Sequence, residues 1–155
     1  MERIKKILAP TDMSEFSQAG VRYALDLART VGAEVTVYHV LSTDELMQQE
    51  LGGPLSHILE RYEGALKKFL DEHFADLLPL VEVRAKVEIG VPDDNIVEEA
   101  EKEGIDMVVL STHGRTGLSH ILVGSVTERV VRHAPCLVLS IRPKAAGGTK
   151  VAAAA

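Results

Sequence analysis

The stretch MVVLSTHGRTGLSHILVGSVTERVVRHAPCLVLSI, residues 107–141, decides the fold. It has a run of apolar and β-branched residues at each end, at 107–111 and 136–141, and helical spacing at 125–133 between them. A strand, a glycine-containing loop, a helix and a second strand in this order are typical of a βαβ unit, whose two strands run parallel. The stretch therefore predicts part of a parallel sheet.

The same alternation extends through the rest of the chain. Three further apolar runs predict strands at residues 4–9, 34–40 and 81–89. Apolar residues at helical spacing predict helices at residues 14–31, 55–78 and 93–103. Strict alternation of strand and helix implies a parallel sheet with helices on both faces, and near-continuous apolar strands suit a sheet buried on both sides. We expect one α/β domain over residues 1–142, with a mobile connection at 42–54.

Composition limits the classes of function. The chain has 155 residues, a formal net charge of -6 and 4% aromatic residues, so nucleic-acid binding is not expected. No apolar run approaches the ~18 residues of a membrane span, and the N-terminal run is too short for a signal peptide. The single cysteine, Cys136, fits a reducing compartment and an inert buried thiol. We expect a cytoplasmic protein with a flexible tail at 143–155, either natural or a remnant of expression.

Glycines surround the start of the last predicted helix. In doubly wound folds ligands lie beyond the carboxyl ends of the strands, and a helix N-terminus attracts anions. Gly124 would let a phosphate approach the backbone, Ser125 and Thr127 would add hydroxyl groups, and Arg115 would add a positive charge. The alternative is that Ser125 forms a capping box with Glu128 and that the glycines only shape a turn.

The exit of the first strand is a second candidate. Asp12 follows that strand, and its carboxylate could accept hydrogen bonds from an adenine amine or a ribose hydroxyl. The alternative is capping of the next helix by Asp12 or Ser14. His113 lies in the glycine loop, and it either touches a phosphate or is a solvated or turn residue. The six histidines show no zinc-binding spacing, so no metal site is predicted. Asp12 and His113 are the only candidates for a general base beside the glycine loop, and neither is convincing, so no catalytic residue is predicted.

These motifs resemble the universal stress protein family, in its nucleotide-binding form, over about residues 3–142. Gly114 is followed by nine residues and then by Gly124 and Ser125, as in the family's signature. The segments ILAPTDMSEFS (7–17) and GVPDDNIVEEA (90–100) resemble the family in place and order. Ser111 stands where the strictest form of the signature has its first glycine.

The resemblance implies a Rossmann-like fold of the adenine nucleotide alpha hydrolase type. Its sheet has five parallel strands in the order 3-2-1-4-5, with ATP or AMP, accompanied by Mg²⁺, across the ends of strands one and four. Carried over by position, the nucleotide-binding residues are Pro10, Thr11, Asp12 and Val40 at the adenine, Ser111, His113, Gly114 and Arg115 at the ribose and phosphates, and Gly124, Ser125, Val126 and Thr127 at the phosphate tail.

The resemblance also implies a homodimer that pairs through the last strand, from Leu137 to Ile141, because an exposed strand edge needs covering. The expected function is that of an ATP-binding, dimeric regulatory module for stress responses, without substantial turnover and with unidentified protein partners. Two alternatives stay open: a nucleotide-free interaction protein of the same fold, for which Ser111 is the main argument, and a slow ATPase or phosphotransferase.

Overall fold

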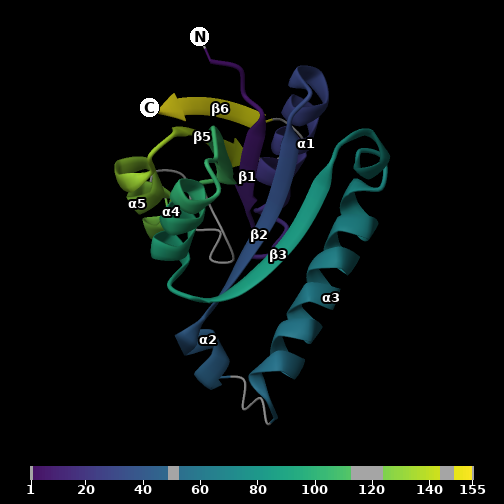
Figure 1. The fold of residues 1–155 in the computed structure, drawn as a ribbon, viewed down its shortest axis with the longest axis vertical. Helices are drawn as coiled ribbons and strands as arrows, with labels where there is room; N and C mark the ends of the chain where they lie inside the picture. The colour runs from purple at the N-terminus through teal and green to yellow at the C-terminus, as the bar shows by residue number, and fades with distance from the viewer. Residues whose placement is uncertain (1, 49–52, 113–123, 144–148, 155) are drawn as a thin grey trace.

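A computed structural model describes residues 2–48, 53–112, 124–143 and 149–154 (Figure 1). Its elements in chain order are β1 (Lys6–Pro10), α1 (Gln18–Val31), β2 (Glu34–Ser42), α2 (Thr43–Gln48), α3 (Leu55–Phe74), a 3₁₀ turn (Leu78–Leu80), β3 (Val83–Gly90), α4 (Pro92–Lys102), β4 (Met107–Ser111), α5 (Ser125–His133), β5 (Leu137–Pro143) and β6 (Thr149–Ala154). The strands and helices predicted for residues 4–141 are all present, with ends shifted by a few residues.

The sheet is covered on both faces. Helices α1 and α3 lie on one face, and α4 and α5 lie on the other (Figure 1). Because successive side chains of a strand point to opposite faces, Ile7 and Ala9 of β1 join the core under α1 and α3, whereas Leu8 joins the core under α4 and α5. All three side chains are fully buried, which explains why β1 reads as a continuous apolar run.

The strand order is β3-β2-β1-β4-β5-β6, and all pairs from β3 to β5 are parallel. The expected five-stranded order 3-2-1-4-5 is confirmed. The order reverses between β1 and β4, so the connections that leave these two strands go to opposite faces. Such a switch point opens a crevice beyond the carboxyl ends of the two strands.

The structure corrects one local prediction, at residues 43–48, and confirms another, at the end of α1. Residues 43–48, expected in a mobile connection, form the short helix α2, and the Ser42 hydroxyl accepts the Glu45 N–H at its start (3.1 Å). The predicted end of the first helix at residue 31 is confirmed, and Gly32 follows it with φ 72°, a conformation that glycine adopts without strain.

The C-terminal end corrects a further expectation. Residues 149–154, expected in a flexible tail, form β6 and pair antiparallel with β5, from Val138↔Ala154 to Pro143↔Thr149. The tail has no apolar alternation that would predict a strand, and what favours pairing is the open edge of β5 beside it. Within the described residues, β5 therefore has a neighbouring strand on each side.

Candidate functional site

A crevice of about 370 Å³ opens where the sheet order reverses, and the described residues form its walls. Nine of the twelve predicted site residues line it: Pro10, Thr11, Asp12, Val40, Ser111, Gly124, Ser125, Val126 and Thr127. They come from the ends of β1, β2 and β4 and from the start of α5. The other three, His113, Gly114 and Arg115, lie outside the described residues.

The loop after β1 is held by its own side chains. The Asp12 carboxylate accepts the Ser14 N–H (3.0 Å), and the Thr11 hydroxyl accepts the Met13 N–H (2.9 Å) and pairs with the Ser17 hydroxyl (2.7 Å). Met13 has φ 62°, an uncommon value for a residue with a side chain. Helix α1 begins after Ser17 without a side-chain cap, so Asp12 closes a turn ahead of the helix rather than capping it.

The backbone of β2 reaches the crevice at Val40. The last residue of β1 in register with β2 is Pro10, opposite Tyr38, and the Thr11 N–H donates to the Tyr38 carbonyl (2.9 Å). Peptide groups alternate between the two sides of a strand. The N–H and C=O of Val40, two residues further on, therefore point to the same side as those of Tyr38, beyond the end of β1 and into the crevice.

The N-terminus of α5 forms the opposite wall. Gly124 is the N-cap residue, no side chain caps the helix within the described part of the chain, and the Gly124 N–H donates to the Thr112 carbonyl (2.8 Å). The capping box considered above is not formed, because Gly124 rather than Ser125 is the N-cap residue and the Glu128 N–H donates to the Gly124 carbonyl (3.0 Å); the Glu128 carboxylate pairs with Arg132 (3.1 Å). The first N–H groups of a helix have no intrahelical acceptor, so this wall presents backbone donors and the positive end of the helix dipole.

Two of the predicted hydroxyl groups have structural partners. The Ser111 hydroxyl accepts the N–H of Gly20 in α1 (3.0 Å), and the Thr127 hydroxyl donates to the Ser111 carbonyl (3.0 Å). These bonds hold the end of β4 between α1 and α5. Thr127 is buried, so it positions the helix, and of the two hydroxyls that we expected to face a phosphate only that of Ser125 lies on an exposed side chain.

The sequence reading missed several residues of the crevice wall. They include Tyr38, His39, Pro92, Ile96 and Thr112. Tyr38 and His39 sit inside an apolar strand, where nothing in the sequence separates a crevice residue from a core residue. His39 is fixed by a bond between Nδ1 and the Thr11 carbonyl (2.8 Å) and by stacking on Tyr62. Thr112 could have been predicted from the sequence, because it directly follows the end of a predicted strand.

Thr112 provides a stability prediction. Thr112 is 4% exposed, and its hydroxyl has no hydrogen-bond partner among the described residues. A buried polar group without a partner costs about 1–3 kcal/mol, so Thr112→Val is expected to raise the free energy of unfolding by about 1 kcal/mol. Urea denaturation of the ligand-free protein measures this change. Thr112→Ser, which keeps the hydroxyl, is the control, and a destabilised Thr112→Val variant would contradict the prediction.

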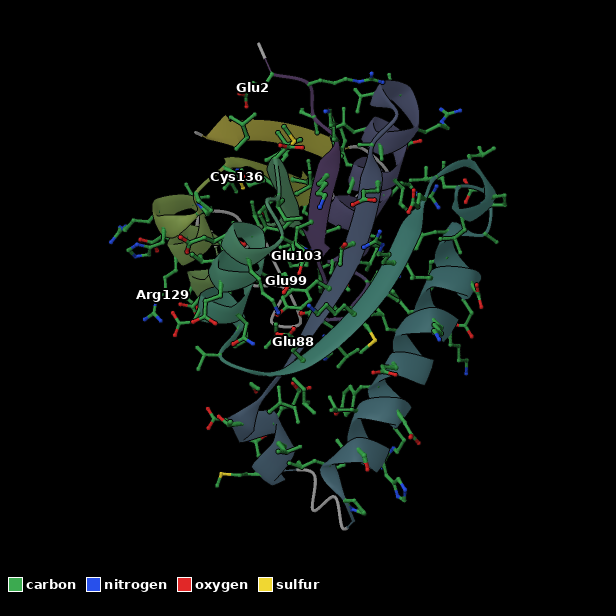
Figure 2. All side chains as sticks on the ribbon, viewed as in Figure 1. Glu2, Glu88, Glu99, Glu103, Arg129 and Cys136 are labelled. Carbon is green, nitrogen blue, oxygen red and sulfur yellow. The ribbon has the colours of Figure 1, made fainter. Side chains whose placement is uncertain are left out.

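A network of polar side chains joins Tyr38, which lines the crevice, to β3 and α4. The Tyr38 hydroxyl donates to Glu88 (2.8 Å), and the Lys86 ammonium contacts Glu88 (3.0 Å) and Glu99 (2.8 Å). Figure 2 labels Glu88 on β3 and Glu99 on α4, and the Lys86 ammonium contacts both carboxylates. Burial, aided by the bond to Glu88, raises the pKa of Tyr38. The hydrogen bond to Glu99 raises the pKa of Lys86 against the opposing effect of burial.

These shifts predict alkaline sensitivity. Because folding raises the pKa of Tyr38, its contribution to the free energy of unfolding is complete below the ordinary tyrosine pKa of 10.0 and is lost as the pH rises from there toward the raised pKa. Tyr38→Phe is expected to lower stability at neutral pH by about 1 kcal/mol and to flatten its decline above pH 10. Urea denaturation between pH 8 and pH 11.5 measures both effects. An unchanged slope in Tyr38→Phe would show that another group causes the decline.

The described residues have three further features, which concern metal binding, membrane spanning and the single thiol. Within residues 2–48, 53–112, 124–143 and 149–154, no cluster of three His, Cys, Asp or Glu side chains could hold a metal ion. No helix there has the length and apolar character needed to cross a membrane. Cys136 is a half-buried free thiol rather than a fully buried one, and burial raises its pKa.

The fold and crevice define a class of protein: a doubly wound parallel α/β domain with a crevice at the switch point, where such folds bind their ligands. The comparisons give the family. The sequence profile of the universal stress protein family matches residues 3–142, and the chain belongs to this family. Universal stress protein MJ0531 of Methanocaldococcus jannaschii is 36% identical, over 89% of this chain and 82% of its own. MJ0577 of the same organism is 32% identical, over 90% and 96%.

Solved structures agree with this assignment. A structure of MJ0577, described as a structure-based assignment of biochemical function, superposes with a TM-score of 0.71 at 30% identity, covering 92% of this chain and 99% of that one. UspA of Lactobacillus plantarum superposes with a TM-score of 0.72 at 25% identity, covering 93% and 100%. A universal stress protein in complex with cAMP, 23% identical with a TM-score of 0.66 over 92% and 100%, shares the fold.

Proposed function

We propose that the chain binds ATP in this crevice and acts as a regulatory module without substantial turnover. The observation that carries the proposal is the N-terminus of α5, which faces the crevice with Gly124 as N-cap and no side-chain cap among the described residues. A helix start of this kind favours an anionic group. A crevice at the switch point of a parallel sheet is where such folds take their ligands.

The base and ribose have candidate partners on the other wall. The Val40 N–H and C=O point past the end of β1, and such a donor–acceptor pair matches the edge of an adenine ring. Asp12 lines the crevice just after β1, the strand that lies between β2 and β4 in the sheet, and it offers carboxylate oxygens to ribose hydroxyls. The buried side chains of Tyr38 and Ile96 supply an apolar surface for the ring.

The phosphate end also fits. A Cβ at residue 124 would lie 3.0 Å from the Thr112 carbonyl oxygen, so glycine keeps the start of α5 packed closely against the end of β4, beside the proposed phosphate position. The Ser125 side chain is exposed beside it. Mg²⁺ belongs to the proposal as an ion bound through nucleotide phosphates and water, which is how it usually binds in such sites. It would also offset phosphate charge in a protein of net charge -6.

Nucleotide titration tests the proposal. Protein stripped of bound nucleotide is titrated with ATP and Mg²⁺ by calorimetry, with AMP and cAMP in parallel. We expect saturable binding near one ATP per chain and weaker binding of AMP, which lacks the terminal phosphates. At a hundredfold excess over Kd the ligand should stabilise the fold by about 2.7 kcal/mol. Absence of both heat and stabilisation would overturn the proposal.

The absence of turnover has its own test. Bound ATP should stay intact over hours, and stoichiometric release of ADP would instead favour a slow ATPase. We propose a cytoplasmic location, as the single cysteine favours, and a homodimer, with protein partners reading the nucleotide-bound state. Because β6 occupies the outer edge of β5 in this structure, pairing of two copies through Leu137 to Ile141 requires that β6 leave that edge. The nucleotide-free alternative rested on Ser111, but its hydroxyl bonds to Gly20 in α1, so the residue has a structural role that is compatible with a nucleotide.

A further inference from the structure

Strand β3 presents charged side chains to α4 where its neighbour β2 presents apolar ones. Successive side chains of a strand point to opposite faces. Val87 joins the core under α1 and α3, whereas Lys86 and Glu88 contact α4. On the same face of the sheet, β2 contributes Tyr38 and Val40 to the apolar core. Apolar side chains often stabilise such places as well as ion pairs do, so packing alone does not explain the two charges.

The Glu88 carboxylate joins β2 to α4. Its Oε2 accepts hydrogen bonds from the Tyr38 hydroxyl of β2 (2.8 Å) and from the Asn95 side-chain amide of α4 (3.4 Å). Its Oε1 contacts the Lys86 ammonium (3.0 Å). Burial opposes ionisation, but the bonds from Tyr38 and Lys86 outweigh it and hold the pKa of Glu88 below its ordinary value. One oxygen of an ionised carboxylate thus bridges two elements that form walls of the crevice.

The orientation of the Asn95 amide is set by the turn between β3 and α4. Its Oδ1 accepts the Val91 N–H (3.1 Å), which leaves Nδ2 to face Glu88. Gly90 provides the space for this amide, because a Cβ there would lie 2.8 Å from Nδ2. Gly90, Asn95 and Glu88 together hold the end of β3 against the start of α4.

A second contact fixes α4 one turn further on. The Lys86 ammonium contacts both carboxylate oxygens of the buried Glu99 (2.8 and 3.0 Å; Figure 2). Asn95 and Glu99 are four residues apart, so they lie on one face of the helix, and both bond to β3. Pro92 and Ile96, also four residues apart, lie on the adjacent face and line the crevice. The two bonds to β3 therefore fix the rotation of α4 that directs Pro92 and Ile96 toward the crevice.

We propose that Glu88 is a positioning residue for the nucleobase, which sets the spacing between β2 and α4 through Tyr38 and Asn95. Glu88 is not among the described residues that line the crevice, so it acts without touching the ligand. Tyr38 and Ile96, the apolar surface assigned above to the base, lie on the two elements that it joins. This role rests on the proposed function, and it concerns affinity for the base and not for the phosphates.

The experiment separates the base from the phosphates. ATP carries both groups and inorganic triphosphate carries the phosphates alone, so the ratio of their Kd values, measured by calorimetry with Mg²⁺, reports the contribution of the base. Glu88→Leu removes the oxygen that Tyr38 and Asn95 share. We expect it to weaken ATP binding about tenfold and to leave triphosphate binding unchanged. A variant that only destabilised the fold would not change the ratio in folded protein.

Three further variants identify the contacts responsible. Glu88→Gln keeps an oxygen that can accept from both Tyr38 and Asn95, so it should retain most of the ATP affinity that Glu88→Leu loses. Tyr38→Phe removes one of the two bonds and should weaken ATP binding, but it should cause no further loss in the Glu88→Leu chain, where its partner is already gone. Glu98→Leu makes the same chemical change at an exposed position of α4, and it should match wild type.

Four results would overturn this role while leaving the proposed function intact. They are a wild-type ratio in Glu88→Leu, equal weakening of ATP and triphosphate in that variant, a Glu88→Gln variant as weak as Glu88→Leu, and additive losses in the double variant with Tyr38→Phe. If Glu88→Leu does not fold, a wild-type ratio in Tyr38→Phe overturns the role instead. A wild-type chain that binds neither ligand would overturn the proposed function, and the role of Glu88 with it.

Discussion

Gly124→Val is expected to weaken ATP binding by at least about 100-fold, or about 2.7 kcal/mol. Gly124 has φ -56° and ψ 149°, values that any residue adopts, so the backbone does not require glycine there. What glycine provides is space, because a Cβ would lie 3.0 Å from the Thr112 carbonyl oxygen, tighter than most such contacts. A valine adds two methyl groups at the start of α5, where the terminal phosphates are proposed to lie.

The matched control is Gly64→Val in α3. Gly64 is exposed, and a Cβ there would meet nothing within 4 Å, so this variant undergoes the same chemical change away from the crevice. Calorimetric titration should give wild-type affinity for Gly64→Val and, for Gly124→Val, a loss that is larger for ATP than for AMP. A Gly124→Val variant that is folded and binds ATP like wild type would show that α5 does not receive the phosphates.

Gly20→Ala is expected to destabilise the fold by about 1–3 kcal/mol. Intrinsic helix propensity predicts the opposite, a gain of about 1 kcal/mol for replacing glycine inside a helix. Gly20 lies in α1 directly against the end of β4, and a Cβ there would lie 2.7 Å from the Ser111 nitrogen and 3.0 Å from the Leu110 carbonyl carbon. These are backbone atoms, so either α1 or β4 has to move.

Gly64→Ala makes the same substitution where the space is open. It should follow propensity and stabilise the protein by up to about 1 kcal/mol. Urea denaturation of the two variants therefore gives changes of opposite sign. If Gly20→Ala were as stable as Gly64→Ala, the close packing of α1 on β4 described here would not exist in solution.

The sequence predicted the parts of the fold that carry a periodic signal. The apolar strands and amphipathic helices were predicted because their burial patterns repeat with the period of the element. The strand order came only from the family resemblance, since alternation does not say which strands are neighbours. α2 and β6 were missed, because Thr43–Gln48 buries no residue and β6 pairs through backbone groups that are present in any sequence.

The crevice was predictable in outline and not in detail. Residues just after strands, such as Asp12, and those at a helix start, such as Gly124, were identified because topology alone brings them together. The partner of each hydroxyl group depends on packing between distant segments. Ser111 bonds to Gly20, 91 residues away, and only the folded chain reveals that this serine and this glycine fit each other.

The position of the Val40 peptide groups has an evolutionary consequence. If a base is recognised through the N–H and C=O of Val40, proline is the one substitution at that position that deletes the N–H, and no substitution deletes the C=O. Mutational drift could then reshape the surrounding walls, through residues such as Tyr38 and Ile96, while hydrogen bonding to the base persists. Recognition through main-chain groups would thus let related sequences diverge widely and change their affinity for the base while keeping the same binding site.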